Sequence, residues 1–307
     1  MKLTASVALT CMLVAFAAGQ TASGPVLGWT LALDGRSVHA IHGVPGASRL
    51  APAASLPGDL QTVKLNPNLN VALALAGDSA VPVILDLNTL ERTALLQARP
   101  GPGLMVWSPS GSALALLYPS AQWVQIFTMR SGSFQLGSEF SAASNQVAVA
   151  DDGSALLAAT PAGLSLYQGG SAGVLSASPA AAFTFLAGGA VPAWWADGRL
   201  TIGSQSVPFT VDEGDTLFLA SPSRARLVAV RAAAGRVTTL DSAGQTVADA
   251  FCNCLVSGLD SLGRPGAILL KAAGVGPLWV ADNAAAPRLF FVPVAPSHPV
   301  DDHRRVR

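Results

Sequence analysis

Two cysteines, Cys252 and Cys254, are the residues of this 307-residue chain whose type and spacing most directly suggest chemistry. On an extended strand, residues two apart face the same side, and a rise of ~3.3 Å per residue puts their Cα atoms ~6.6 Å apart. Because a disulfide tolerates a Cα separation of up to ~6.8 Å, a bend in the strand would allow a local bridge. We therefore predict a disulfide between Cys252 and Cys254, which would stabilise only weakly because it closes a very short loop.

Two other interpretations of this cysteine pair stay open. The thiols are either reduced and without a special role, or they serve a redox or metal function. Two thiolates alone cannot complete a tetrahedral zinc site, and no histidine lies near them in the sequence. These observations favour the disulfide over the metal.

The remaining polar residues form no recognisable catalytic or metal-binding motif. His39 and His42 are three apart, so on a strand they point to opposite faces and do not share a metal. Asp212, Glu213 and Asp215 offer oxygen ligands for calcium but lack the spacing of an EF-hand, which favours a solvated turn. The sequence contains no G-x-S-x-G motif and no phosphate-binding G-x-x-x-x-G-K-[ST] loop. We therefore predict no catalytic residue, no bound metal and no cofactor.

Trp194 and Trp195 are the residues best suited to recognition at the surface. Adjacent residues of a strand face opposite ways, so both rings are exposed together only at the end of a strand. A flat aromatic ring in such a place can anchor a partner. Packing of the two rings between structural units is the alternative, and it is the commoner role of tryptophan.

The composition restricts the classes of partner. Charged residues make up 12% of the chain, against about 25% in typical globular domains, and 18 basic residues balance 18 acidic ones. Without a basic stripe, we expect no nucleic-acid partner. Beyond the N-terminus no run of ~18 apolar residues occurs, so we expect no membrane span in the mature chain. The apolar excess instead fits strands that are buried on both faces.

Residues 1–19 have the pattern of a secretory signal peptide. Lys2 supplies the positive start, and Val7 to Ala18 is an apolar stretch of suitable length. Ala17-Ala18-Gly19 then places small residues before a cleavage site at Gln20. We therefore expect an exported protein that is periplasmic, cell-surface or extracellular, in a compartment where disulfides persist. An uncleaved N-terminal anchor is the alternative, but the apolar run is too short to span a bilayer.

The elements that would position these residues repeat along the chain. The stretch from Trp107 to Gly132 begins with a Ser-Pro-Ser-Gly turn and continues with two short strands, Ala113 to Tyr118 and Trp123 to Met129. Similar turns recur at intervals of roughly 40 residues, a period typical of propellers and other repeat proteins. The other turns are Asp34-Gly35, Asn66-Pro67-Asn68, Asp151-Asp152-Gly153, Gly188-Gly189, Ser221-Pro222-Ser223 and Asp260-Ser261-Leu262-Gly263.

Each unit contains about four segments of strand length and no helical stripe. Four-stranded units repeated around an axis form a β-propeller. We therefore predict an all-β protein with one β-propeller over residues 24–295, made of seven blades of about four antiparallel strands. We expect Val26 to Leu56 to form a divergent seventh blade that a C-terminal strand would close, and six blades with a grafted hairpin is the alternative. We expect a disordered tail over residues 296–307.

Two sets of residues resemble known propellers. The turn Trp107-Ser108-Pro109-Ser110-Gly111 before an apolar strand resembles the repeat mark of WD-repeat and YVTN-like propellers. Several segments near the C-terminus resemble the closing repeat of a group of exported bacterial propellers, namely Cys252-Asn253-Cys254, Ser257-Gly258-Leu259, Pro277-Leu278-Trp279-Val280 and Pro287 to Pro293. The resemblance implies a fold and a compartment but no activity. The WD dipeptide is absent and Ser110 replaces the usual Asp, so a eukaryotic type of scaffold role is not implied.

Three functions are compatible with this reading. The first is a monomeric, non-catalytic, exported module that binds a protein, a peptide or a glycan, by analogy with other propellers. The second is a hydrolase or lyase whose site lies at the central channel and uses Asp86 with Arg36, Arg92 and Arg199. The third is a redox or metal role of the Cys-x-Cys pair. The missing catalytic motifs favour the first.

Overall fold

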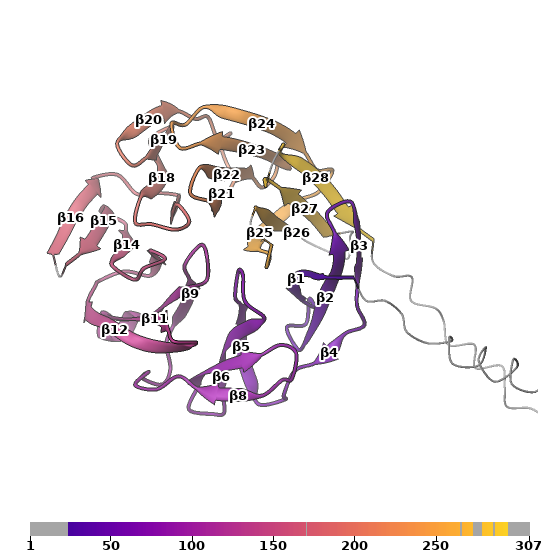
Figure 1. Ribbon diagram of the computed structural model, residues 1–307. Helices are drawn as coiled ribbons and strands as arrows, with labels where there is room; N and C mark the ends of the chain where they lie inside the picture. Colours follow the sequence, from indigo (N-terminus) through magenta and orange to yellow (C-terminus); the bar gives the residue numbers. More distant parts are fainter. Residues whose placement is uncertain (1–23, 170, 265, 273–277, 285, 294–307) are drawn as a thin grey trace, which may run out of the picture.

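The chain folds into a ring of seven four-stranded antiparallel sheets (Figure 1). The computed structural model describes residues 24–169, 171–264, 266–272, 278–284 and 286–293. The prediction of an all-β propeller with seven blades is confirmed, and the six-blade alternative is wrong. The predicted signal peptide over residues 1–19 and the predicted tail over residues 296–307 lie outside the described residues, so both stay predictions.

The seven blades follow one another along the chain. Blade 1 comprises β1 (Val26–Leu31), β2 (Ser37–Val44), β3 (Ala47–Leu50) and β4 (Ala54–Ser55); blade 2, β5 (Leu60–Leu65), β6 (Val71–Ala76), β7 (Val81–Asp86) and β8 (Arg92–Ala94); blade 3, β9 (Leu104–Trp107), β10 (Ala113–Tyr118), β11 (Trp123–Arg130) and β12 (Ser133–Ser141); blade 4, β13 (Gln146–Val149), β14 (Ala155–Thr160), β15 (Gly163–Gln168) and β16 (Ser171–Ser176); blade 5, β17 (Ala182–Phe185), β18 (Pro192–Ala196), β19 (Arg199–Ile202) and β20 (Gln205–Pro208); blade 6, β21 (Leu217–Ser223), β22 (Arg226–Arg231), β23 (Arg236–Asp241) and β24 (Thr246–Phe251); and blade 7, β25 (Val256–Ser261), β26 (Ala267–Ala272), β27 (Leu278–Asp282) and β28 (Arg288–Val292). One short 3-10 helix, η1 (Pro119–Ala121), joins β10 to β11.

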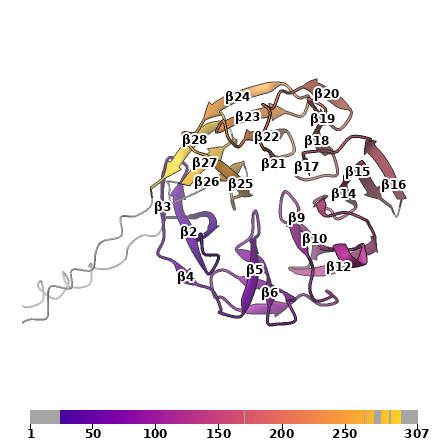
Figure 2. The same cartoon turned by 180° about the vertical axis from the view of Figure 1, so that it is seen from behind.

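The first strand of a blade lies nearest the axis, and the last strand forms the outer rim (Figures 1 and 2). The turn that marks the sequence repeat therefore joins the first strand to the second in every blade. In blade 3 this is the turn between β9 and β10. Because all seven of these turns lie at one end of the blades, neighbouring turns can contact one another around the ring.

Blade 1 differs from the other six. Two short strands share the outer edge of β2, since β3 pairs with the segment 41–44 and β4 with Ser37 and Val38. The expectation that a C-terminal strand closes this blade is wrong, because β28 pairs with β27 in blade 7. Each sheet is thus built from one continuous stretch of chain. The ring closes by packing between blades 7 and 1, where Leu27 and Ile41 join a buried cluster with Leu262 and Leu269.

The core is divided among the seams between blades. In the described residues, seven buried apolar clusters occur, and each draws its members from two neighbouring blades. In β14, Leu156 and Ala158 face the seam with blade 3, whereas Ala155 and Leu157 face the seam with blade 5. A middle strand is therefore apolar on both faces, which accounts for the low fraction of charged residues in the composition.

Polar side chains join the marker turns of neighbouring blades. The side-chain amide of Asn66 in blade 2 donates to the carbonyl oxygen of Gly111 in blade 3 at 2.8 Å. Asp151 in blade 4 accepts from the backbone N–H of Ser110 at 2.7 Å and from that of Gly188 in blade 5. These hydrogen bonds thus connect the marker turns of blades 2 to 5 at one end of the propeller. In the described part of the chain, no helix is long and apolar enough to cross a membrane.

Candidate functional site

A cleft of about 830 Å³ lies between blades 3 and 4. One wall is formed by β11 and β12 of blade 3, and the other by the two turns that precede β14 and follow β15 in blade 4. We call this hollow the 3/4 cleft. Its volume is within the range of about 300 to 1,000 Å³ that is usual for ligand sites.

A β-bulge shapes the wall on blade 3. Ile126 pairs with Ser138 and Phe127 pairs with Leu136, so Gly137 is an extra residue in β12. Since Gly137 has no side chain, it leaves space above Thr128, whose hydroxyl oxygen would lie 3.6 Å from a Cβ atom added there. Thr128 Oγ1 is buried and has no hydrogen-bond partner within the described residues. A buried hydroxyl without a partner is uncommon and is satisfied most simply by a bound polar group or water.

Blade 4 approaches the same threonine through a glycine turn. Gly153 has a φ of +69°, and a Cβ atom added there would lie 2.3 Å from Thr128 Cγ2. Only glycine fits both the left-handed backbone and the close contact. The turn that the sequence marked as a repeat signal is therefore also the part of blade 4 that closes the inner end of the cleft.

Aromatic and charged side chains line the rest of the cleft. The rings of Phe140 and Tyr167 stack across the seam, with centroids 5.3 Å apart and an interplanar angle of 18°. Arg130 and Glu139 come from blade 3 and Asp152 from blade 4, and all three are exposed. A lining that mixes both charges, hydroxyls and aromatic edges suits a polar ligand with many hydrogen-bonding groups.

Local hydrogen bonds fix the charge of Asp152. Partial burial alone would raise the pKa of its carboxyl group, but hydrogen bonds from the N–H and the hydroxyl of Ser154 outweigh this effect. The pKa of Asp152 is therefore held below its usual value. The carboxylate presents a fixed negative charge at the rim of the cleft at neutral pH.

A buried polar network holds the carboxylate of Glu139 in place. The amide nitrogen of Gln125, which is 1% exposed, donates to Glu139 Oε2 at 3.1 Å and to the carbonyl oxygen of Gln97 at 3.0 Å. Tyr118 donates its hydroxyl to the carbonyl oxygen of Arg99 at 2.6 Å and to Gln125 Oε1 at 3.1 Å. Burial raises the pKa of Tyr118 to about 12. The network also ties the connection between blades 2 and 3 to blade 3.

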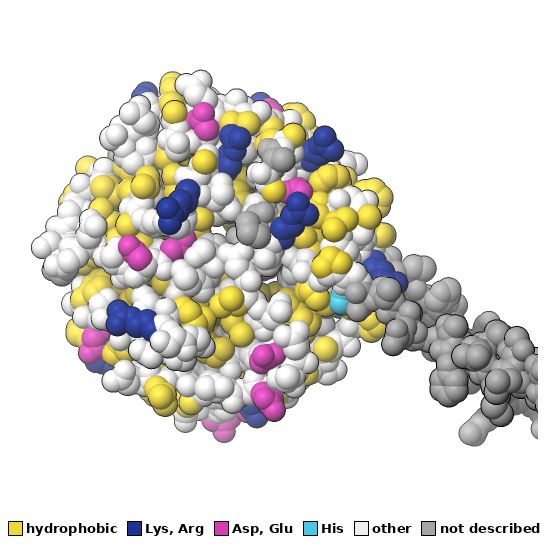
Figure 3. All heavy atoms as spheres, viewed as in Figure 1, with side chains coloured by type: hydrophobic (Ala, Val, Ile, Leu, Met, Phe, Trp, Pro, Cys, Tyr) yellow, Lys and Arg dark blue, Asp and Glu magenta, His cyan; other side chains and the backbone are white. Residues whose placement is uncertain are grey.

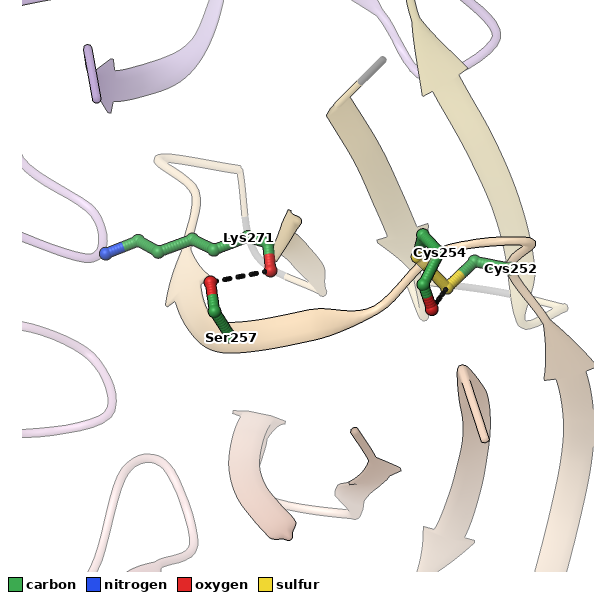
Figure 4. The surroundings of a disulfide bond; sticks show 4 residues. All are labelled: Cys252, Cys254, Ser257 and Lys271. Atoms are coloured by element: carbon green, nitrogen blue, oxygen red, sulfur yellow. Dashed lines mark hydrogen bonds between the residues drawn. A yellow bond between two sulfur atoms is a disulfide. The ribbon is translucent and has the colours of Figure 1, made fainter. Parts of the chain in front are cut away.

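The predicted disulfide between Cys252 and Cys254 is present (Figure 4). The two Cα atoms are 5.2 Å apart, closer than on a straight strand, because the chain bends after β24 ends at Phe251. The bend packs against the turn between β22 and β23, where the Cys252 N–H donates to the carbonyl oxygen of Gly235 at 2.9 Å. Cys252 is 5% exposed. The disulfide thus clasps the connection between blades 6 and 7.

The two tryptophans offered as recognition residues lie at seams. Trp194 is 9% exposed and belongs to the buried cluster between blades 4 and 5. Trp195 faces the opposite seam and packs against the cluster between blades 5 and 6, and its indole N–H donates to the carbonyl oxygen of Phe209 at 2.8 Å. The ring of Trp194 therefore gives no exposed face to a partner, and that of Trp195 is partly covered and held in place.

The histidines and the acidic turn are engaged locally. His39 Nδ1 lies 3.0 Å from the carbonyl oxygen of Ala51, and His42 Nδ1 lies 3.1 Å from that of Gly24. In the acidic turn, Asp215 accepts hydrogen bonds from two backbone N–H groups. Within the described residues, no three His, Cys, Asp or Glu side chains are grouped so that they could hold a metal ion.

The residues that the enzyme hypothesis named do not meet. Asp86 caps the turn after β7 through the N–H groups of Asn88 and Thr89. Arg92, on the outer strand β8 of the same blade, forms an ion pair at 2.6 Å with Asp59, which directly precedes β5. The other two arginines of that hypothesis lie in other blades, Arg36 in blade 1 and Arg199 in blade 5. None of the four residues lines the hollow at the axis of the ring.

The sequence did not reveal the residues of the 3/4 cleft. Phe140 and Tyr167 belong to different repeats, and nothing in either repeat marks them. The Asp-Asp-Gly turn was recognised, but only as a turn. Figure 3 shows that the acidic and basic side chains on the displayed face are scattered rather than gathered into one patch. Charge patterning therefore offered no signal for the site.

Comparison with known proteins supports the fold. No protein-family model matches the chain, and no curated protein sequence matches it. Among solved structures, a chain of Kuenenia stuttgartiensis hydrazine synthase is similar with a TM-score of 0.54 and 13% identity, over 87% of this chain and 98% of that one.

Two similar structures are WD40-type propellers. The Cps50 (Swd1) β-propeller domain of Myceliophteria thermophila has a TM-score of 0.53 and 14% identity, over 78% of this chain and 87% of its own. The WD40 repeats of RRP9 have a TM-score of 0.54 and 13% identity, over 78% of this chain and 83% of their own. At such identities the likeness shows the fold alone: the chain is a seven-bladed β-propeller with the general architecture of WD40 propellers.

Proposed function

We propose that the protein is a non-catalytic binding module that holds a peptide or glycan, free or as part of a protein, in the 3/4 cleft. The observation that carries this proposal is the lining of the cleft, where the buried hydroxyl of Thr128, which has no partner among the described residues, lies below exposed groups of both charges. Peptides and glycans carry many hydrogen-bonding groups and can satisfy such a wall. The propeller scaffold supports the proposal because both walls belong to packed blades that need not rearrange.

Export is part of the same proposal. The secretory pattern of residues 1–19 and the resemblance to exported bacterial propellers support it, and so does the disulfide between Cys252 and Cys254, since disulfides persist outside the cytosol. N-terminal sequencing of the protein purified from a secretory host should begin at Gln20. Recovery of the uncleaved chain from the cytosol would contradict export. We further expect a monomer that does not bind nucleic acid.

Binding to the cleft can be tested with arrays of peptides and glycans. Wild-type protein should bind a subset of one array, and the Ser138→Trp variant should lose that binding because a large ring in β12 fills the cleft. Ser242→Trp is the matched control, since Ser242 is also exposed but lies in a turn of blade 6. The proposal would be contradicted if the wild type bound neither array. It would also be contradicted if Ser138→Trp and Ser242→Trp bound equally well.

The central-channel enzyme is the weaker alternative. It requires acidic, histidine or arginine side chains that converge from several blades. Asp86 and the three arginines that the sequence suggested are separated in the structure. Asp86, Arg92 and Arg199 each make local contacts within their own blade region. The redox alternative is also weaker, because Cys252 is almost completely buried and both thiols are already joined in a local disulfide, although Cys254 is partly exposed.

A further inference from the structure

A second hollow, separate from the 3/4 cleft, lies at the axis of the ring. This central cavity has a volume of about 380 Å³ and is lined mainly by the innermost strands of six blades. Partly exposed leucines contribute to its wall, namely Leu31 in blade 1, Leu65 in blade 2, Leu104 in blade 3 and Leu259 in blade 7. A cavity of this size can hold a small molecule.

Two lysines, Lys64 and Lys271, line this central cavity. The full sequence contains one other lysine, Lys2, which lies in the predicted signal peptide. Elsewhere the chain uses arginine for its strongly basic groups. The mature protein therefore places both of its lysines at the axis, although the two are more than 200 residues apart in the sequence.

Lys271 reaches the cavity from the second strand of its blade, whereas the other lining residues come from innermost strands or the turns that follow them. Its partner in the register is Gly258 of β25. Because Gly258 has no side chain, the stem of Lys271 can cross the inner strand, and Lys271 Cδ lies 3.6 Å from the position of a Gly258 Cβ. Figure 4 shows the lysine extending away from the disulfide, past Ser257 and across the inner strand.

The neighbour that holds the ammonium group of Lys271 is Asp260. Lys271 Nζ lies 2.7 Å from Asp260 Oδ2, which is buried and has no other polar partner within the described chain. The ion pair neutralises one of the two lysines. It also keeps the ammonium group at the cavity rather than in bulk solvent.

Lys64 lies on β5, and its backbone is fixed by blade 3. The indole N–H of Trp107 donates to the carbonyl oxygen of Lys64 at 2.9 Å. Within the described residues, the ammonium group of Lys64 takes part in no ion pair. Two ammonium groups against one carboxylate leave the cavity with one positive charge. In a cavity partly enclosed by protein, such a charge attracts an anion more strongly than it would in open water.

We propose that the central cavity binds a small organic anion, a carboxylate carried on a short apolar body. Lys64 is the main contact for the carboxylate, and Lys271, held by Asp260, is the second. The apolar body lies against the partly exposed leucine side chains of the wall. This site is independent of the 3/4 cleft, and its ligand is smaller than the peptide or glycan proposed there.

Hexanoate is a suitable probe, because it combines one carboxylate with a short apolar chain. Isothermal titration calorimetry of the full mature protein should show saturable binding of hexanoate. Neutral 1-hexanol, cationic hexylammonium and inorganic phosphate should each bind more weakly. Binding of hexanol as tight as that of hexanoate would overturn the role of the lysines. Binding of phosphate as tight as that of hexanoate would overturn the role of the apolar wall.

The variant Lys64→Met keeps most of the stem but removes the charge. The dissociation constant for hexanoate should rise about 10- to 100-fold, which is the usual effect of losing a hydrogen bond to a charged group. Arg49→Met is the matched control, since it removes one positive charge from exposed β3 on the outer edge of blade 1. The control should bind hexanoate like the wild type.

Two further variants make the test independent of folding and of the cleft. Lys271→Met should also weaken hexanoate binding, and its melting curve will show whether the freed Asp260 affects stability. Ser138→Trp, which blocks the 3/4 cleft, should leave hexanoate binding unchanged. The proposal is overturned if wild-type protein does not bind hexanoate, if Lys64→Met binds it as well as the wild type, or if Arg49→Met weakens binding as much as Lys64→Met.

Discussion

Asp151 Oδ1 accepts a hydrogen bond of 2.7 Å from the backbone N–H of Ser110, which joins blade 4 to blade 3. The other carboxylate oxygen of Asp151 accepts from the backbone N–H of Gly188 in blade 5. The side chain is only 8% exposed. One residue of a marker turn thus connects three consecutive blades, and the turns that define the sequence repeat also hold the repeats together.

Replacement of Asp151 by alanine should lower the stability strongly. The change leaves two backbone N–H groups without their acceptor, and each buried group left unpaired costs about 1 to 3 kcal/mol. We expect the free energy of unfolding to fall by about 2 to 4 kcal/mol in urea denaturation. Asp152→Ala is the control, because Asp152 is exposed and, among the described residues, its side chain accepts hydrogen bonds only from Ser154. Equal losses for the two variants would show that the contacts between turns contribute little.

The seam that closes the ring can be tested at Gly28. A Cβ atom added there would lie 2.7 Å from Leu262 Cδ2 and 3.2 Å from the backbone nitrogen of Gly263, both in blade 7. Overpacking of this kind costs about 1 to 3 kcal/mol, so Gly28→Ala should lower the melting temperature. Gly173→Ala should not, since nothing lies within 4 Å of a Cβ atom added there. An unchanged melting temperature for Gly28→Ala would mean that blades 1 and 7 are not tightly packed.

The repeat and its strands could be predicted because they depend on local signals. Each blade returns to the same turn chemistry, and strand length follows from the spacing of Gly, Pro, Ser, Asn and Asp. The disulfide between Cys252 and Cys254 was predictable for the same reason, since the two residues are neighbours. The split outer edge of blade 1 was not, because β3 and β4 are short and lie in a segment rich in proline and alanine.

The sites were beyond sequence reasoning because both faces of a blade are buried. In a half-exposed sheet, alternation tells which of two adjacent residues faces solvent. In this propeller Trp194 and Trp195 point to opposite seams, so alternation could not separate packing from recognition. The 3/4 cleft depends on Phe140 and Tyr167 meeting from different repeats, and the central cavity depends on Lys64 and Lys271 lining one space from different blades.

The raised pKa of Tyr118 predicts a loss of stability at alkaline pH. Burial is the main cause, and it raises the pKa from an ordinary value of 10.0 to about 12. Folding raises this pKa, so the folded state binds the phenol proton more tightly than the unfolded state does. The resulting stabilisation of the folded protein is complete below the pKa of the unfolded state, and it is lost as the pH rises through the pKa of the folded state. We therefore expect the urea midpoint to fall between about pH 10 and pH 12.

Substitution of the two tyrosines separates this effect, because the chain has only Tyr118 and Tyr167. Tyr118→Phe should remove the tyrosinate absorbance step near pH 12 and should cost about 1 kcal/mol at neutral pH, since its hydroxyl no longer donates to Arg99 and Gln125. Tyr167→Phe should retain the late step. A Tyr118 step at the same pH as that of an unfolded chain would show that the network is open to water.

The disulfide should make only a small contribution to stability. A cross-link stabilises mainly by restricting the unfolded chain, and one that spans a sequence separation of 2 restricts very little. The double variant Cys252→Ala/Cys254→Ala should therefore fold, with a free energy of unfolding about 1 to 2 kcal/mol below that of the wild type. Reducing agent should lower the wild type to the level of the variant and leave the variant unchanged. A loss above about 4 kcal/mol, or failure of the variant to fold, would mean that the clasp sets the path of the chain between blades 6 and 7. A cross-link over so short a loop cannot cause a loss of that size by restricting the unfolded chain alone, so the disulfide would then also stabilise the folded protein directly.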